Sequence, residues 1–307
     1  MLPARVPRPS PRPRPQAPTS PSTAPEPEPA PSASGPATVL PVTRERIAQS
    51  LRRRGYRFLV DESGDICGLW AYRFFSFYIV RGQMLQVRGR WPRQASIERL
   101  WEILAFTNAW NSSRHLPKCY VRVHDDGRVH VLTEVCIPVT SGLSDRGRRR
   151  LRRAGPSLPR SGAEWRTSRG AAHHEIAPVT PQRVRALVSQ RGEFVRVAQG
   201  GVTGRIDQQT YQVIVEDNDL VVRTRWSRLL PPGSNRSAAQ LVNDWNRDRV
   251  LPTLFTSAFD DGIAVFAVSS TPVAVGLTDD QLADVVDVAL TVTAHALRTL
   301  AASVPAS

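Results

Sequence analysis

Asn108-Ala109-Trp110-Asn111 returns about 135 residues later as Asn243-Asp244-Trp245-Asn246. Each copy is followed at similar spacing by a Leu-Pro pair and an Asp-Asp-Gly tripeptide. The match extends outward, because Pro-Val-Thr precedes both copies and Gly-Leu-Ser-Asp or Gly-Leu-Thr-Asp follows them. A period of this length is that of a whole domain rather than of a solenoid unit. The sequence therefore predicts two copies of one fold.

The predicted elements occur in the same order in both copies. A short amphipathic helix begins near Thr43 or Thr180, and segments rich in aromatic and β-branched residues follow, separated by short turns. Short connections favour antiparallel pairing. A second helix then ends at the Trp-Asn pair, and a hairpin turns at Asp-Asp-Gly. We predict an α+β fold whose unit runs helix, antiparallel sheet, helix, hairpin, helix, with the second copy more complete.

Two capping boxes are predicted in the second copy. Ser237 has Gln240 three residues later, and Thr278 has Gln281 at the same spacing. A Ser or Thr side chain at the first position can accept from the backbone of the third helical residue, whose Gln side chain reaches back. Each pair therefore predicts the start of a helix, and the second begins the long closing helix.

Composition divides the chain into four parts. Residues 1–40 are rich in Pro, Ser and Ala and are expected to form a disordered tail. Residues 41–145 and 178–302 are the predicted domains, and residues 146–177 are an Arg-rich linker. We find neither an apolar run long enough to span a bilayer nor a segment of signal-peptide type, so we expect a cytoplasmic protein without membrane contact.

The positive charge is concentrated in the linker. The chain has a net charge of +14, of which residues 145–170 supply +7 through nine Arg and two acidic residues, whereas residues 171–307 carry 12 Arg and 14 acidic residues. Such a run attracts phosphate without sequence preference, although the acidic second copy is an alternative, intramolecular partner. The candidate phosphate contacts are Arg146, Arg148, Arg149, Arg150, Arg152 and Arg153.

No catalytic, cofactor or metal site is predicted. Asp125-Asp126 and Asp260-Asp261 precede glycines between alternating strands, which is typical of turns rather than of general acid/base pairs. His124 and His130 lack a third ligand at zinc spacing. The three cysteines form no C-x-x-C pair and are interpreted as small buried hydrophobic residues.

Aromatic residues are the candidate partner contacts. Six fall between Trp70 and Tyr78, more than one face of two strands easily buries, so part of them is predicted to form an exposed patch, with core packing as the alternative. In the repeated motif, Trp is interpreted as an anchor of the helix on the sheet. The final Asn is interpreted as bonding the last carbonyls of the helix or adopting the left-handed cap, with ligand contact as the alternative for both residues. The candidates are Trp70, Tyr72, Phe75, Phe77, Trp110, Asn111, Trp245 and Asn246.

These motifs resemble the YbjN domain family, in particular its two-copy members. The residues that carry the resemblance are Trp110-Asn111, Pro117-Lys118-Cys119-Tyr120, Asp125-Asp126-Gly127 and Gly142-Leu143-Ser144-Asp145, and it covers residues 41–145 and 178–302. It implies a fold similar to that of type III secretion chaperones, which bind other polypeptides and catalyse nothing.

The expected function is therefore a non-enzymatic protein-binding module, chaperone-like or a regulatory adaptor in stress or signalling. The alternative function is non-specific nucleic-acid association through the linker. We expect an unidentified protein partner, and either packing between the two domains or a homodimer.

The first copy departs from the family pattern after Ser144. Where the family has an apolar closing helix, residues 146–177 contain an Arg run, several Pro and Gly residues and no helical periodicity. Either this linker is truly divergent or the reading frame slips here. If it is divergent, the first sheet is short of cover and the two domains can complete one another.

Overall fold

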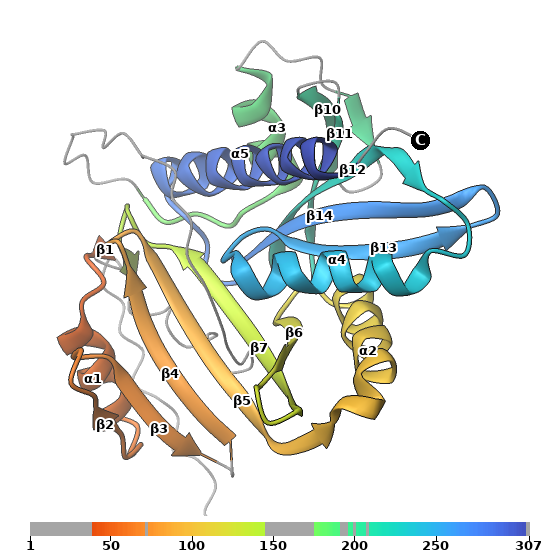
Figure 1. Ribbon diagram of the computed structural model, residues 1–307. Coiled ribbons are helices and arrows are strands. Elements are labelled where there is room, and N and C mark those ends of the chain that lie inside the picture. The colour runs from red at the N-terminus through yellow and green to blue at the C-terminus, as the bar shows by residue number, and fades with distance from the viewer. Residues whose placement is uncertain are drawn as a thin grey trace, which may run out of the picture. The chain divides into compact units, whose positions relative to one another are not determined.

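Two six-stranded antiparallel sheets with the same strand order make up the fold (Figure 1). The computed structural model describes residues 39–70, 73–144, 175–190, 196–198, 201–206 and 209–304, and all of them belong to one unit that begins at Pro36. We call residues 39–144 the first repeat and residues 175–304 the second repeat. This confirms the α+β prediction and the duplication.

Sheet 1 lies in the first repeat and has the order β2-β3-β4-β5-β7-β6. β7 is buried at nearly every position, whereas β4 is mostly half-buried or exposed. β5 is interrupted by a register shift between Arg90 and Gln94. The strands are β2 (Leu59–Val60), β3 (Ile66–Trp70), β4 (Arg73–Val80), β5 (Met84–Ser96), β6 (Lys118–Val123) and β7 (Arg128–Pro138).

Sheet 2 repeats this arrangement with the order β9-β10-β11-β12-β14-β13. Its register shift lies between Arg225 and Leu229 of β12, the position equivalent to the shift in β5. The duplication therefore preserves strand order and the irregularity within the sheet. The strands are β9 (Arg196–Ala198), β10 (Gly201–Ile206), β11 (Gln209–Glu216), β12 (Asp219–Leu230), β13 (Thr253–Phe259) and β14 (Gly262–Pro272).

Three helices begin at threonine caps that confirm predicted starts. Thr43 and Thr180 accept hydrogen bonds from the backbone N–H of Arg46 and Arg183. Thr278 and Gln281 form the predicted capping box of the long closing helix. The helices are α1 (Arg44–Arg52), the 3-10 turn η1 (Ile97–Arg99), α2 (Leu100–Ser113), α3 (Pro181–Ser189), α4 (Asn235–Asp248) and α5 (Asp279–Ser303).

The other predicted capping box was wrong. α4 starts at Asn235 with Ser234 in the capping position, and the Ser237 hydroxyl donates to the Ser234 carbonyl instead of receiving a backbone N–H. The Gln240 side chain donates to Asp244. The helix begins two residues before Ser237, directly after the short turn that contains Pro231 and Gly233 and follows the end of β12 at Leu230.

A short strap closes each repeat. β1 (Val39–Leu40) pairs with β8 (Leu143–Ser144), and in the second repeat Ala177 pairs with Leu277 at the equivalent place. Gly276 has φ 79°, and a Cβ on it would lie 2.4 Å from the Ala177 carbonyl oxygen, so glycine is required for this approach. The Gly-Leu repeat seen in the sequence therefore serves the strap.

α5 is the core helix of the second repeat. Its apolar side chains pack on sheet 2 in two clusters, one around Val222 and Leu282 and the other around Trp226 and Leu297. By length and composition alone the helix is long and apolar enough to cross a membrane, but 56% of its apolar window is buried in the protein. That burial is typical of the core helix of a soluble protein.

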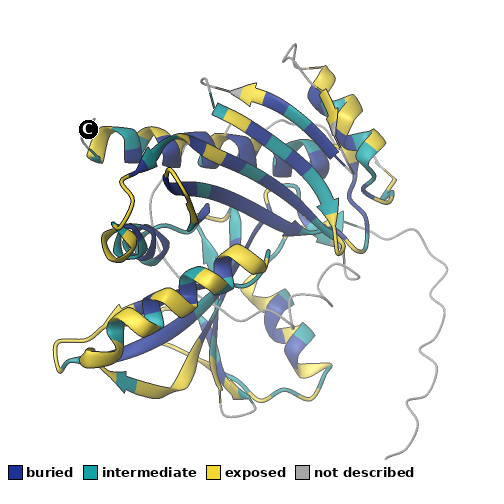
Figure 2. Ribbon diagram, turned by 90° about the vertical axis from the view of Figure 1, so that its right-hand side faces the viewer, coloured by how far each residue is buried: buried dark blue, intermediate teal, exposed yellow. Residues whose placement is uncertain are grey.

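The described part of the first repeat ends at Ser144 and contains no counterpart of α5. The chain is described again from Glu175. The predicted Arg-rich linker and its six candidate phosphate contacts lie outside the described residues. So does all of the predicted tail except Val39 and Leu40, which form β1. Exposed and buried residues alternate along the helices that cover the sheets (Figure 2).

Candidate partner-binding surface

The repeated Asn-x-Trp-Asn motif joins helices to the edge strands of the sheets. The Asn111 side chain donates to the Cys119 carbonyl and accepts from the Cys119 N–H, both at 2.7 Å. Asn246 makes the same pair of bonds to Leu254, both at 2.8 Å. Because β6 and β13 end their sheets, these backbone groups have no neighbouring strand. The two asparagine side chains therefore supply hydrogen-bond partners to the backbone groups of the edge strands. The prediction that they cap the helix carbonyls was wrong.

The first asparagine of each motif reaches the other repeat. Asn243 accepts from the Val121 N–H at 2.7 Å and donates to the Val121 carbonyl at 3.2 Å. Asn108 accepts from the Thr256 N–H at 2.8 Å and donates to the Thr256 carbonyl at 3.0 Å. Val121 and Thr256 occupy equivalent edge positions, so the exchange is reciprocal. We call these four hydrogen bonds the asparagine clasp.

The clasp is part of a contact between the two repeats. The sequence had left packing between the domains and a homodimer as alternatives. α2 contacts β13, α4 contacts β6, and the two helices contact each other. Ala239 of α4 packs with the buried Leu104, Val121 and Val129 of the first repeat. The repeats therefore pack together within one chain. Sequence reasoning missed Asn108 and Asn243, although their recurrence at the head of both motifs was the available signal.

The two motif tryptophans are structural anchors, as predicted. The Trp110 indole donates to the Pro117 carbonyl at 2.8 Å, and the Trp245 indole donates to the Pro252 carbonyl at 3.2 Å. Each bond ties the end of a helix to the start of the following edge strand. The guanidinium groups of Arg114 and Arg249 lie over the respective rings. Trp110, Asn111, Trp245 and Asn246 are therefore committed to the fold.

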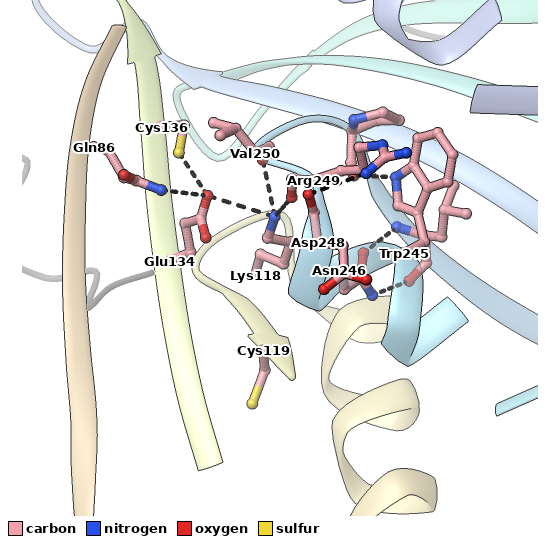
Figure 3. Close-up of polar contacts among 12 residues, drawn as sticks. Gln86, Lys118, Cys119, Glu134, Cys136, Trp245, Asn246, Asp248, Arg249 and Val250 are labelled. Atoms are coloured by element: carbon pink, nitrogen blue, oxygen red, sulfur yellow. Dashed lines mark hydrogen bonds and ion pairs between the residues drawn. The ribbon is translucent and has the colours of Figure 1, made fainter. Parts of the chain in front are cut away.

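A buried polar cluster also spans the repeats (Figure 3). The Lys118 ammonium donates to the Arg249 carbonyl at 2.6 Å and to the Val250 carbonyl at 2.9 Å, both just beyond α4. It also lies 3.5 Å from Glu134 Oε1. Cys136 donates to the same oxygen at 2.8 Å. The chain's one lysine is thus a buried link between the repeats, which charge counting did not indicate.

Burial controls the acid-base chemistry of this cluster. It raises the pKa of Glu134 to about 7, against the opposing effect of the nearby Lys118 ammonium. Burial likewise raises the pKa of the Cys136 thiol well above its usual range and that of Cys119 to about 12. Neither thiol is activated as a nucleophile by this environment. In the second repeat the same face holds an apolar cluster around Val221, Phe255 and Val268.

The aromatic candidates of β3 and β4 come together on one face of sheet 1. Trp70 lies 5.7 Å from Phe75 and 6.0 Å from Phe77, measured between ring centroids. Its indole donates to the Arg57 carbonyl at 2.9 Å. All three aromatic side chains are half-buried. Tyr72 lies outside the described residues.

The same face of sheet 2 is closed by α5. Trp226 is 2% exposed and packs with Leu297 and Leu300 of that helix, whereas the equivalent Trp91 is 48% exposed. The pairing of the strands also makes Tyr211 the counterpart of Phe75, and Tyr211 is fully buried. The open face of sheet 1, defined as Trp70, Phe75, Trp91 and Thr133, is therefore the candidate surface.

The Asp-Asp-Gly segments are turns, as predicted. Gly127 has φ 74°, and the Asp126 carboxylate accepts from the Arg128 N–H at 3.0 Å. The ring centroids of His124 and His130 lie 4.3 Å apart with the rings tilted by 50°, and burial together with the neighbouring imidazole lowers the pKa of His130. Among the residues that the structure describes, no three His, Cys, Asp or Glu side chains are grouped as metal ligands.

The family model that matches this chain is YbjN, described as "Putative bacterial sensory transduction regulator", over residues 43–149 and 180–302. The chain belongs to the YbjN family. Among solved structures, YbjN of E. coli, described as "a putative transcription regulator", is similar at 14% identity and a TM-score of 0.38. The match covers 43% of this chain and 100% of that one, so the relative is about the size of one repeat. No curated protein matches the chain.

Proposed function

We propose that this YbjN-family chain is a non-enzymatic regulatory adaptor, chaperone-like in action, that binds a polypeptide in the cytoplasm through its first repeat. Membership of a family described as regulators supports the regulatory part of the proposal. The observation that carries the binding part is the 48% exposure of Trp91 at a position whose counterpart, Trp226, is 2% exposed. An exposed aromatic side chain on an apolar face is typical of protein contacts.

The difference between the two repeats in how their sheets are covered supports this proposal. The second repeat closes its sheet with α5, while the first keeps half-buried aromatic side chains on the equivalent face. The asparagine clasp and Lys118 hold the repeats together through groups away from that face. In this arrangement the second repeat stabilises the chain and the first offers the contact surface.

Site-specific photo-crosslinking in the native cell tests the proposal. A benzophenone amino acid in place of Trp91 is expected to capture a discrete protein, because it lies on the open face. The matched control places the same group at Val197, which is 61% exposed on β9 of the second repeat. Equal products at the two positions, or none at position 91, would remove the basis of the proposal.

Non-specific nucleic-acid binding by the linker is the second candidate function, favoured by the charge of residues 145–170, which is +7. Affinity for any duplex DNA or RNA is then expected to fall steeply with added salt. It is also expected to fall when Arg148, Arg149 and Arg150 are replaced by Ala. Affinity that is insensitive to both changes would exclude the linker as the phosphate contact.

A further inference from the structure

We infer that the open face of sheet 1 binds an acidic amphipathic helix of a partner protein, placed as α5 is placed on sheet 2. The inference rests on the proposed protein-binding function and names the kind of partner. The two repeats share strand order, register shift and strap, so the second repeat shows which element fits this face. In the second repeat that element is a helix.

One row of paired residues across each sheet shows why a helix fits. In sheet 1 the row runs Gly68, Phe75, Gly89, Thr133, and in sheet 2 it runs Gly204, Tyr211, Thr224, Ala267. The Thr224 hydroxyl lies 3.2 Å from the Thr293 hydroxyl of α5. Sheet 1 has Gly89 at the position equivalent to Thr224.

The row in sheet 1 therefore accepts a helix with a small or aliphatic side chain at the position of Thr293. The residues of α5 that lie beside Thr293 and pack on sheet 2 are of the same type, Ala289, Ala296, Leu297 and Leu300.

Two arginines on sheet 1 indicate the direction of the partner helix and the charge of its polar side. Arg228 of sheet 2 donates to the Val304 and Ala301 carbonyls at the C-terminal end of α5, at 3.2 and 3.5 Å. Its counterpart in sheet 1, Arg93, is exposed. Arg73, also exposed, replaces Gln209 on the same edge of the open face. The partner helix is therefore expected to end at Arg93 and to carry acidic residues on its polar side.

The chain's own linker does not have the sequence for this role. Residues 145–174 contain only three large apolar side chains, Leu151, Leu158 and Trp165, and two prolines interrupt any helical stripe. An apolar stripe at helical spacing is what α5 presents to sheet 2. The occupant is therefore expected to come from another protein.

Binding of a labelled, acetylated peptide with the sequence of residues 279–303 to the full chain tests the inference. The peptide carries the apolar stripe of α5, so it tests whether the open face accepts a helix of this kind. Fluorescence anisotropy is expected to show saturable binding, weakened about 10-fold or more by Trp91→Ala, as for a central aromatic contact. Trp101→Ala, a change of a 42%-exposed Trp on α2, is expected to leave the affinity unchanged.

Hydrogen exchange on the same complex locates the contact. Protection is expected in β4 and β5, and protection confined to other strands would overturn the inference. Peptide binding that appears only after Leu151, Leu158 and Trp165 are changed to Ser would show that the linker occupies the open face. A dimer in sedimentation that is lost with Trp91→Ala would show that a second copy of the chain occupies it. If the peptide fails while position 91 still crosslinks a protein, the proposed function stands and the helical partner is wrong.

Discussion

An asparagine side chain presents a donor NH2 group beside an acceptor C=O group, which is the complement of an unpaired backbone peptide on an edge strand. Val121 is 1% exposed, so its N–H and C=O have no access to water, and Asn243 supplies both bonds. An unpaired buried backbone group costs about 1–3 kcal/mol. The motif therefore contributes to stability through hydrogen bonds at a place where strand pairing ends.

Asn243→Ala is expected to lower the free energy of unfolding by about 2–4 kcal/mol, because two buried backbone groups lose their partners. Asn108→Ala is expected to cost less, since its bonds to Thr256 are only partly buried. Urea unfolding followed by circular dichroism measures both losses. Asn235→Ala, at an exposed position on α4, is the control and should change little. A loss at Asn243 no larger than at Asn235 would contradict this account.

The Glu134 carboxyl is expected to make stability depend on pH. Its pKa rises from an ordinary value of 4.5 to about 7 in the folded protein, so the folded state holds a proton that the unfolded state has released in this range. The free energy of unfolding therefore falls as pH rises from about 4.5 to about 7 and stays lower above it. The loss is on the order of a few kcal/mol.

Urea unfolding at pH 5, 6, 7 and 8 checks this dependence. Glu134→Gln keeps the shape and removes the ionisation, so its unfolding free energy should vary less over this range than that of the wild type. Glu62→Gln, an exposed change, should retain the wild-type slope. Parallel curves for the wild type and Glu134→Gln would show that Glu134 titrates normally.

Residue roles were only partly predictable from sequence. Turn residues, the indole anchors and the Thr278 capping box follow from local rules, because each involves groups within about ten residues. Asn108, Asn243 and Lys118 bond to groups more than 100 residues away. Spacing along one chain does not encode such partners. The buried Lys118 also contradicts the expectation that charged side chains lie at the surface.

At the scale of elements, α5 explains why equivalent tryptophans have different surroundings. Trp226 lies between sheet 2 and the C-terminal half of the helix, and the Arg228 guanidinium lies over its ring. Trp91 has the same place in the strand without a described helix above it. The environment of a strand residue is therefore determined by the covering layer, which periodicity within the strand does not reveal.

Trp226→Ala is expected to lower the unfolding free energy by about 3–5 kcal/mol, the range for a large buried aromatic side chain. Trp91→Ala should cost about 1 kcal/mol, because half of its surface is already in water. Thermal or urea unfolding of the two variants side by side gives the comparison. Equal losses would mean that Trp91 is covered in solution, which would also weaken the proposed binding surface.

Element positions were largely predictable, and their ends less so. The helices at Thr43, Thr180 and Thr278 and the two hairpins lie where capping and turn residues placed them. β5 and β12 run beyond Trp91 and Trp226, because a register shift lets each strand continue past an irregular segment that sequence periodicity does not bridge. The straps were not predicted, since two-residue strands leave no periodic signal.

At the scale of the whole molecule, the contact between repeats is expected to make unfolding cooperative. The asparagine clasp and Lys118 connect edge strands and helices of both repeats, so neither can open without exposing buried backbone of the other. Urea unfolding followed by tryptophan fluorescence should show one transition, because both repeats contain tryptophans. The transition by circular dichroism should coincide with it.

Asn108→Ala with Asn243→Ala and Lys118→Met is expected to separate this unfolding into two transitions. The second repeat should unfold last, because α5 completes its core. Ser112→Ala with Asn235→Ala changes exposed polar residues of the same helices and serves as the control. Retention of a single, coincident transition in the triple variant would show that other contacts couple the repeats.

The asparagine clasp also affects whether strands of other protein molecules can pair with the edges of these sheets. At the border formed by β6 and β13, side-chain amides already bond the backbone of Cys119, Val121, Leu254 and Thr256, so an incoming strand cannot pair with these residues. At the opposite border, β2 and β9 have two and three residues of strand within the part of the chain that the structure describes. Lateral growth into amyloid-like stacks is thus disfavoured at both borders, and concentrated samples should remain free of thioflavin-binding fibres until the clasp asparagines are removed.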